Sequence, residues 1–358
     1  MKALIAAGGN ARRLRPITYT INKHLIPLAN KPMIFFAIEH IVEAGIQEIF
    51  ININPGEKEL QQYVGDGGRW GARITYVEQT GGPKGVAHII KNAEHFMRGE
   101  PFLFHLGDNI VLGDLRRFAQ RFAEENLDAL FAFARVPDPQ RFGVPVIEHG
   151  KLVRIEEKPA VPKTDLAQTG IYFYNDTVFE AVNSIEPSSR GEYEISDANT
   201  FLIQAGRRVG WEEITGWWKD TGKPEDLLEG NQLLLNEVLS KEAINNGMIG
   251  PNVKIQGRVQ IGKNTKVWDN VLIRGPVSIG ENAMIKNSYI GPYTSIGNNC
   301  VIDNTEIEHS VIMDYAEVRA GTRIVDSIIG KNAIIESSKN SLPLGHKLVI
   351  GDNSQVEV

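Results

Sequence analysis

Short apolar runs alternate with longer amphipathic segments through the N-terminal two thirds of the chain. The apolar runs predict strands over Ala3–Ala7, Glu48–Asn54, Ile74–Glu78, Phe102–Leu106 and Ala129–Arg135. The segments between them predict helices over Met33–Ala44, Glu57–Val64, Val86–Phe96 and Leu115–Asn126. This alternation is typical of a Rossmann-like α/β domain, in which a mostly parallel sheet carries helices on both faces. Ligands of such sheets bind beyond the carboxyl ends of the strands.

The alternation loosens after Arg135. Strands are predicted over Leu152–Glu156 and Gly170–Tyr174, and helices over Thr177–Ser184 and Ser196–Gly206. A long helix over Leu227–Asn246 is predicted to close the domain.

From Ile249 onward the spacing of apolar residues changes to a period of six. The recurring positions are Ile249, Ile255, Ile261, Val267, Ile273, Ile279 and Ile285, then Ile290, Ile296 and Ile302 after a slip of one residue, and later Val318 and Ile324. Such a repeat predicts the coils of a parallel β-helix. An α-helix is excluded because six is not a multiple of 3.6 and because Gly and Asn are frequent. We therefore expect a catalytic domain over residues 1–245 and a β-helix over residues 246–358.

The first predicted strand leads into a glycine loop with a concentration of positive charge. Gly8 and Gly9 follow the strand, Arg12, Arg13, Arg15, Lys23 and Lys31 come next, and no acidic residue precedes Glu39. Backbone N–H groups of a Gly-rich turn can cradle phosphate oxygens that neighbouring cations neutralise. Arg13 is the guanidinium expected on a triphosphate, because its planar fork matches phosphate geometry. Lys23 could reach the reacting phosphates from another side.

The composition predicts a soluble protein with a local binding site for anions. The net charge is -6, which argues against nucleic-acid binding and makes the basic loop a local exception. One cysteine, Cys300, fits a reducing compartment. No signal-peptide pattern and no apolar segment long enough to span a bilayer are present, so we expect a cytoplasmic protein that does not bind membranes.

Two acidic motifs are candidates for metal binding. Asp108, in the sequence Leu106-Gly107-Asp108-Asn109, lies at the tip of a predicted strand, where a carboxylate can hold Mg²⁺ beside a nucleotide. Asp220, in Trp217-Trp218-Lys219-Asp220, could supply a second carboxylate. Each motif is also an ordinary turn sequence when taken alone.

Two further motifs suit recognition of a base and a sugar. In Glu156-Glu157-Lys158-Pro159, the proline is expected to keep the preceding residues extended, Glu157 could accept hydrogen bonds from sugar hydroxyls, and Lys158 could meet a phosphate. Gln79 follows a predicted strand, and its amide can pair with a base edge. Gly85 opens the next helix and would let a flat ring come near.

Taken in order, these motifs resemble those of the sugar-1-phosphate nucleotidyltransferases. The resemblance covers essentially the whole chain and is greatest to the long-type glucose-1-phosphate thymidylyltransferases, which carry a C-terminal left-handed β-helix. It implies transfer of a nucleotidyl group, with dTTP and glucose 1-phosphate as the expected substrates and Mg²⁺ as the cofactor. The residues carried over are Gly8, Gly9, Asn10, Arg13 and Lys23 for the triphosphate and catalysis, Gln79 and Gly85 for the base, Asp108 and Asp220 for Mg²⁺, and Leu106, Gly143, Glu157, Lys158 and Gly170 for the sugar phosphate.

One stretch departs from the family pattern. The family loop usually reads Gly-Gly-x-Gly-Thr-Arg, whereas this chain has Ala11 in place of the last glycine and Arg12 in place of the threonine. If the glycine normally has positive φ, alanine costs roughly 1 kcal/mol there. Arg12 adds a charge beside the triphosphate.

Three alternatives remain open from the sequence. Gln79 suits uracil as well as thymine, which leaves a UTP-dependent uridylyltransferase. A bifunctional enzyme is the second, because hexapeptide β-helices can carry acetyltransferases with a histidine base, and His309 and His346 are available. The third is a non-catalytic protein that binds sugar nucleotides. For all of them we expect a homo-oligomer.

Overall fold

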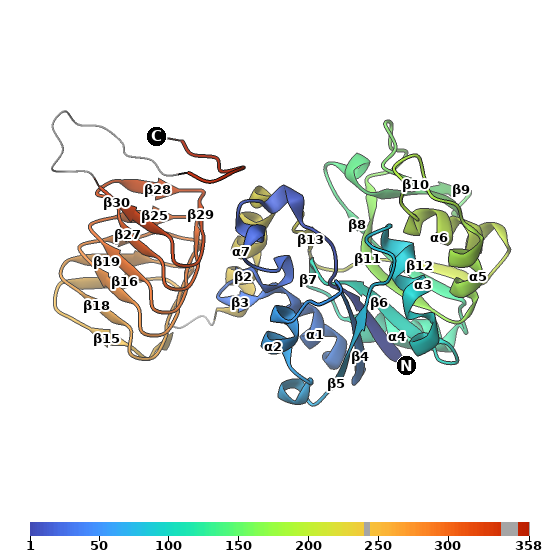
Figure 1. The fold of residues 1–358 in the computed structure, drawn as a ribbon, viewed down its shortest axis with the longest axis horizontal. Coiled ribbons are helices and arrows are strands. Elements are labelled where there is room, and N and C mark those ends of the chain that lie inside the picture. The colour runs from blue at the N-terminus through green and yellow to red at the C-terminus, as the bar shows by residue number, and fades with distance from the viewer. Residues whose placement is uncertain (240–243, 338–349, 358) are drawn as a thin grey trace. The chain divides into compact units, whose positions relative to one another are not determined.

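The computed structural model describes residues 1–239, 244–337 and 350–357. They form two compact units (Figure 1). The first consists of Met1–Asn10 with Met33–Asp220, and the second of Ala11–Pro32 with Thr221–Val358. The basic segment that follows the glycine loop, Ala11–Pro32, therefore packs with the C-terminal part of the chain.

A seven-stranded sheet forms the centre of the first unit, in the order β12-β8-β11-β6-β1-β4-β5. The strands are β1 (Lys2–Ala6), β4 (Glu48–Ile53), β5 (Arg73–Glu78), β6 (Phe102–Leu106), β8 (Ala129–Arg135), β11 (Leu166–Tyr174) and β12 (Val209–Glu213). All neighbouring pairs are parallel except those that β11 makes with β6 and β8. The predicted mostly parallel α/β sheet is confirmed.

Helices connect these strands as the sequence predicts, with ends shifted by a few residues. They are α1 (Met33–Glu43), α2 (Glu59–Val64), α3 (Val86–Met97), α4 (Leu115–Glu124), α5 (Thr177–Ser184) and α6 (Ile195–Gln204). The core on one side of the sheet is rich in aromatic rings, and Phe104 and Tyr172 stack there at 6.0 Å between neighbouring strands. Burial of such large apolar rings is the main source of stability in a domain of this size.

Two small antiparallel pairs extend from the central sheet. One joins β9 (Gly143–Glu148) to β10 (Lys151–Glu157), and the other joins β7 (Asn109–Val111) to β13 (Trp218–Asp220). Both pairs begin or end at a motif that the sequence analysis singled out. They position those motifs relative to one another within the unit.

The second unit begins with the basic segment and the helix α7 (Pro224–Val238). The basic segment contains three short 3₁₀ turns, Arg12–Leu14, Ile17–Tyr19 and Lys23–Leu25, and the hairpin of β2 (Pro27–Leu28) and β3 (Lys31–Pro32). The prediction of a helix over Leu227–Asn246 is wrong at its C-terminal end. Leu239 is already extended after α7, and Ile244–Asn245 is the first strand of the β-helix. Ile244 and Asn245 pair in parallel with Gln260 and Ile261, so this segment belongs to the first sheet of the β-helix.

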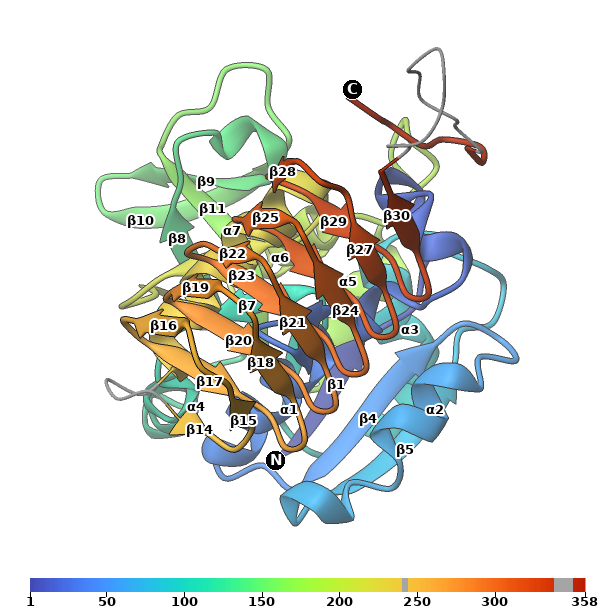
Figure 2. The ribbon, with the colours of Figure 1, turned by 90° about the vertical axis from the view of Figure 1, so that its left-hand side faces the viewer.

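Three parallel sheets stack along the rest of the unit and form the predicted β-helix (Figure 2). The first contains β14 (Ile244–Asn245), β17 (Val259–Ile261), β20 (Val277–Ile279), β23 (Thr294–Ile296), β26 (Val311–Ile312) and β29 (Ile328–Ile329). The second contains β15 (Met248–Ile249), β18 (Lys266–Trp268), β21 (Met284–Lys286), β24 (Val301–Asp303), β27 (Glu317–Arg319) and β30 (Ile334–Glu336). The third contains β16 (Val253–Gln256), β19 (Val271–Arg274), β22 (Tyr289–Ile290), β25 (Glu306–Glu308) and β28 (Arg323–Val325).

The period of six places one aliphatic residue of each strand inside the coil. Ile273, Ile290 and Ile307 stand in register on successive coils, and all are fully buried. At the corners the backbone turns through left-handed residues, of which Asn270, Asn287 and others are asparagines. Asparagine tolerates positive φ better than other residues with a side chain, which explains its frequency in the repeat. In the described residues, no helix is long and apolar enough to cross a membrane.

Candidate active site

The glycine loop is held by an asparagine that the sequence analysis did not single out. The backbone N–H of Gly9 donates to Asn54 Oδ1 at 2.9 Å, and Asn54 Nδ2 donates to the carbonyl of Gly9 at 3.1 Å. Gly9 has φ +103, a conformation that a side chain would strain. Asn54 directly follows β4, which is the neighbour of β1 in the sheet. The residue at the end of β4 therefore holds the glycine loop that follows β1.

Gln79 lies directly beside this loop. A Cβ added to Gly8 would lie 3.1 Å from Gln79 Oε1 and 3.2 Å from Asn52 Oδ1, so a side chain there would crowd both amides. The Gln79 side chain is buried and its Nε2 lies 3.4 Å from His88 Nδ1. Partial burial and the neighbouring Lys84 and Lys91 lower the pKa of His88. The predicted base-binding amide and the predicted phosphate loop are therefore in contact.

Gly85 begins α3 with φ +102. A Cβ there would lie 2.6 Å from the carbonyl oxygen of Tyr193, and the Tyr193 N–H donates to the carbonyl of Lys84 at 2.7 Å. Gly85 is thus required for close packing against the backbone of the segment before α6, and that packing accounts for the glycine by itself. Its assignment to the base stays a prediction.

The two carboxylates predicted to bind a metal lie at the same end of one strand pair. In the β7–β13 ladder, Asp220 is the partner of Asn109, which follows Asp108 in the chain. Asn109 Nδ2 also donates to Asp108 Oδ1 at 2.9 Å and fixes that carboxylate. Both aspartates are half-buried, so part of each remains accessible. Among the residues that the structure describes, no group of three or more Asp, Glu, His or Cys could hold a metal ion.

Trp218 connects several of the predicted site residues. Its indole Nε1–H donates to Asn109 Oδ1 and to the carbonyl oxygen of Thr169, both at 2.8 Å. Its ring packs edge-on against Phe142 with centroids 5.0 Å apart. One side chain of the Trp-Trp-Lys-Asp motif thereby touches the Gly-Asp-Asn motif and the residues that directly precede Gly143 and Gly170. No pattern in the sequence signals this role, because a tryptophan beside a strand end is usually a packing residue.

The predicted sugar-phosphate residues lie around the β9–β10 pair. Gly143 and Glu157 are cross-strand partners, and a Cβ on Gly143 would lie 2.6 Å from Ser196 Oγ and 2.7 Å from Gln168 Nε2. Ser196 Oγ in turn donates to Glu157 Oε2 at 2.6 Å. A buried polar network therefore orients the Glu157 carboxylate, which leaves further lone pairs available to accept.

Cations surround the other oxygen of Glu157. Arg190 Nη2 lies 3.1 Å and Lys158 Nζ 3.2 Å from Glu157 Oε1. Lys158 has φ +47, so the extended geometry predicted for this residue before Pro159 is wrong. The N–H of Lys158 donates to the carbonyl of Phe142 at 2.9 Å, and this bond holds the left-handed turn. Arg190 Nη2 also lies 2.8 Å from Glu194 Oε1, so this guanidinium is shared between carboxylates. Of the two cations, sequence analysis found only Lys158.

Leu106 and Gly170, the last two candidates for the sugar site, lie against each other. A Cβ on Gly170 would lie 2.7 Å from Leu106 Cδ1, and Gly170 has φ +74 at an irregularity in the β11–β8 pairing. Gly170 therefore lets β11 pass close to the tip of β6, directly before Asp108. The two residues are together in space, and their role toward a sugar stays a prediction.

The basic segment of the second unit carries the remaining candidates. Ala11 has φ 40 and ψ 42, so the position where the family has glycine does have left-handed geometry in this chain. Arg12 and Arg13 are exposed in the first 3₁₀ turn, which buried Leu14 fastens to the unit. Lys23 is half-buried in the third turn, where the side chain of Asn22 accepts from the N–H of His24 at 2.9 Å.

A buried histidine lies next to the Gly-Asp-Asn motif. His105, the penultimate residue of β6, is fully buried, and its Nδ1 lies 2.8 Å from the carbonyl oxygen of Leu106. Desolvation lowers the pKa of His105 to about 4. The ring is therefore neutral near neutral pH, and its role is to fill the core behind the metal-binding candidates.

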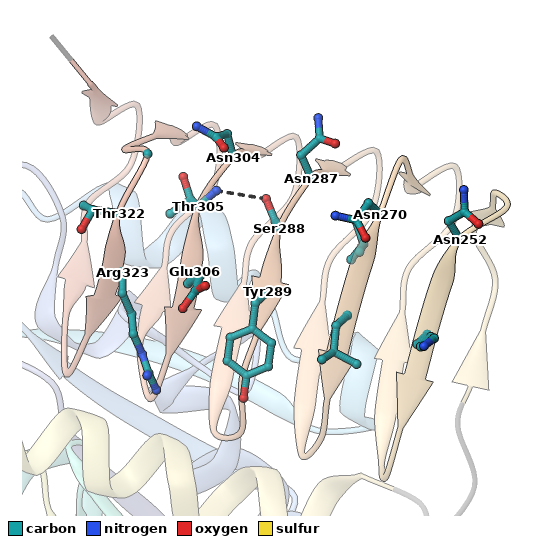
Figure 3. Close-up of a pocket in the computed structure, with 14 residues that line it drawn as sticks. Asn252, Asn270, Asn287, Ser288, Tyr289, Asn304, Thr305, Glu306, Thr322 and Arg323 are labelled. Carbon is teal, nitrogen blue, oxygen red and sulfur yellow. Dashed lines mark hydrogen bonds between the residues drawn. The ribbon is translucent and has the colours of Figure 1, made fainter. Parts of the chain in front are cut away.

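The β-helix carries a broad groove and an ion-paired histidine. The groove, of about 590 Å³, has Asn252, Asn270, Asn287 and Asn304 in a row along one edge (Figure 3). His309 pairs with Asp326 at 2.5 Å, while its Nε2 is buried. In this conformation Nδ1 is paired with a carboxylate and Nε2 is covered, and the acetyltransferase alternative stays a prediction. His346 lies outside the described residues.

Comparison with protein families agrees with this geometry. The family model described as nucleotidyl transferase matches residues 2–237. The chain belongs to the nucleotidyltransferase family. A second model, described as the GMPPB C-terminal domain, matches residues 273–357 in the β-helix part of this nucleotidyltransferase.

Full-length relatives support the same assignment. The nucleotidyltransferase is 41% identical over 361 residues to the low-salt glycan biosynthesis nucleotidyltransferase Agl11 of Haloferax volcanii, with 100% of both chains covered. It is 39% identical over 359 residues to a glucose-1-phosphate thymidylyltransferase of Streptomyces griseus, with 100% of this chain and 99% of the relative covered. Together with the family model, these relatives show that the chain is a sugar-1-phosphate nucleotidyltransferase.

A solved structure resembles part of the nucleotidyltransferase. It is a putative glucose-1-phosphate thymidylyltransferase from Bacillus anthracis, with a TM-score of 0.63 and 35% identity. The match covers 68% of this chain and 98% of that one.

Proposed function

We propose that the protein transfers a thymidylyl group from dTTP to glucose 1-phosphate, which gives dTDP-glucose and pyrophosphate. The observation that supports the chemistry best is the Trp218 contact set, because Trp218 bonds to Asn109 beside the metal candidate Asp108 and touches Phe142 and Thr169, the residues before the sugar-site candidates Gly143 and Gly170. The choice of dTTP and glucose 1-phosphate rests on the names of full-length relatives at 39% identity.

In the proposed reaction, a phosphate oxygen of the sugar 1-phosphate attacks the α-phosphorus of the nucleotide. The new P–O bond forms as the bond from the α-phosphorus to the bridging oxygen of the β-phosphate breaks, and pyrophosphate leaves with that electron pair. No covalent intermediate with the protein is required. Catalysis then consists of positioning two anions and neutralising their charge.

Each group of residues has a proposed task in this reaction. The glycine loop held by Asn54 presents backbone N–H groups to the phosphates. Arg13 steadies the leaving pyrophosphate, and Lys23 offsets the repulsion between the two substrates. Glu157 accepts hydrogen bonds from sugar hydroxyls while Lys158 meets the sugar phosphate.

The residues present fit a magnesium ion. Asp108 and Asp220 would hold it, because the β7–β13 register brings both oxygen ligands to one strand end. Mg²⁺ is commonly bound through one or two carboxylates, with phosphates and water completing its shell, so two carboxylates suffice. When bound, the ion supplies neutralisation of phosphate charge.

Pyrophosphate release tests the proposal across a grid of nucleoside triphosphates and sugar 1-phosphates with Mg²⁺. We expect the highest kcat/KM for dTTP with glucose 1-phosphate. An Asp108→Asn variant purified in the same way should release no pyrophosphate. A higher kcat/KM with UTP would overturn the choice of dTTP. Nucleotide binding without pyrophosphate release from any pair would contradict the enzymatic function.

A further inference from the structure

The basic segment has little regular structure of its own. It consists of three 3₁₀ turns of three residues each and a hairpin whose strands have two residues each. Isolated elements of this length are not stable, so contacts from elsewhere must fix the position of Arg13 and Lys23. The hairpin turn, Ala29-Asn30, has φ 47 and 61, and such a turn needs support because alanine disfavours this region.

A single buried amide in α7 supplies part of that support. Asn231 is fully buried, and its Oδ1 accepts from the backbone N–H of Ala29 at 2.8 Å and from Ser295 Oγ at 2.7 Å. Its Nδ2 donates to the carbonyl oxygen of Tyr293 at 3.0 Å. One side chain therefore bonds the turn of the basic segment to two residues around strand β23 of the β-helix.

The neighbouring residue of the turn makes a second, independent connection. Asn30 Nδ2 donates to Ser278 Oγ at 3.0 Å and to the carbonyl oxygen of Ile296 at 2.9 Å. Ser278 lies in β20 and Ile296 in β23, on adjacent coils of one sheet. The turn is thus bonded directly across two coils, and its position depends on how those coils stack.

We propose that Asn231 and Asn30 are positioning residues for nucleotidyl transfer, through which the stacked coils β20 and β23 set the placement of Arg13 and Lys23. The inference rests on the proposed function. Displacement of a phosphate-binding group by about 1 Å can cost on the order of 100-fold in rate. In this proposal the β-helix takes part in catalysis by positioning these two cations.

Two substitutions on opposite sides of one contact test the proposal in the full-length protein. Asn30→Asp keeps the size and the tolerance of positive φ but loses the donor to Ile296, and Ser278→Ala removes the acceptor in the β-helix. The matched control is Asn236→Ala. Asn236 also connects α7 to the β-helix, because its carbonyl oxygen and its Oδ1 each accept from Arg258 at 2.6 Å, and neither bond involves the basic segment.

We expect the first two variants to raise KM for the nucleotide and lower kcat, with a combined loss of about 10- to 100-fold in kcat/KM. KM for the sugar phosphate stays unchanged, since its proposed contacts lie in the first unit. Asn236→Ala keeps all three parameters. Equal losses in Asn236→Ala, or a fall in melting temperature with unchanged kinetics in Asn30→Asp and Ser278→Ala, would overturn the positioning role.

Hydrogen exchange of peptides within residues 11–32 separates this proposal from the proposed function. Faster exchange in Asn30→Asp and Ser278→Ala, but not in Asn236→Ala, supports the positioning role, and equal exchange in all three refutes it. Absence of turnover in the wild-type protein would count against the proposed function alone, because the exchange comparison needs no substrate.

Discussion

The indole nitrogen of Trp218 donates to the side-chain oxygen of Asn109 at 2.8 Å, and Asn109, the residue after Asp108, is the strand partner of Asp220. The tryptophan therefore does more than fill space. It fixes the strand end on which the two carboxylates stand, and it does so through a bond that phenylalanine could not make.

Trp218→Phe is expected to lower kcat by at least about tenfold and to destabilise the fold by about 1–3 kcal/mol, because Asn109 Oδ1 and the Thr169 carbonyl lose their donor. The measurements are steady-state kinetics and denaturant unfolding. Trp211→Phe is the control, since Trp211 packs on Phe133 at 6.0 Å in the same unit. A Trp218→Phe variant with the activity of the control would contradict the assigned role.

Asp108→Asn is expected to abolish turnover at saturating Mg²⁺, with a loss of at least about 100-fold, because a neutral amide is a poor magnesium ligand. Asp220→Asn should raise the Mg²⁺ concentration needed for half-maximal rate. The control is Asp114→Asn, which alters the N-cap of α4, where Asp114 accepts from the N–H of Arg116 at 2.9 Å. Near-wild-type kcat in Asp108→Asn would refute the metal assignment.

Gly143→Ala is expected to raise KM for the sugar phosphate about tenfold or more, since the new Cβ would lie 2.6 Å from Ser196 Oγ and displace the network that orients Glu157. KM for the nucleotide should change little. Gly330→Ala provides the control, because its added Cβ has no atom within 4 Å. Unchanged sugar-phosphate kinetics would remove Gly143 and Glu157 from the proposed site.

Arg12→Thr, which restores the family residue, is expected to raise KM for the nucleotide about threefold at low salt, because an exposed cation is lost beside the triphosphate. The difference from wild type should disappear in about 1 M salt, where charges are screened. Arg12→Lys keeps the charge and serves as the control. A salt-independent change would show that Arg12 acts through shape.

His105 predicts a specific pH dependence of stability. Burial lowers its pKa to about 4 from the ordinary value of 6.5, so the unfolded chain binds a proton more readily than the folded protein in this window. Stability should therefore be complete above pH 6.5 and fall as the pH decreases toward 4, with His105 contributing on the order of 3 kcal/mol. Denaturant unfolding of wild type and His105→Gln at both pH values tests this. Identical pH slopes would contradict it.

Local sequence patterns were sufficient for most elements of the fold. The apolar runs predicted the central strands, and the period of six predicted the β-helix, because a strand or coil repeats its burial pattern over consecutive residues. The end of α7 was misjudged, since the pairing of Ile244 and Asn245 with β17 is made by residues more distant in sequence. The boundary between residues 245 and 246 stays a prediction.

For the candidate site, sequence determined which residue types were available, and tertiary structure decided which of them meet. Asp108 and Gln79 were found from their place after predicted strands. The sequence analysis missed Asn54, Trp218 and Asn231, because the residues that they bond to are far away along the chain. The separation is 45 residues from Asn54 to Gly9, 109 from Trp218 to Asn109, and 202 from Asn231 to Ala29. A hydrogen bond between distant segments leaves no periodic trace in a single sequence, so only folding shows that the basic segment packs with α7 and the β-helix.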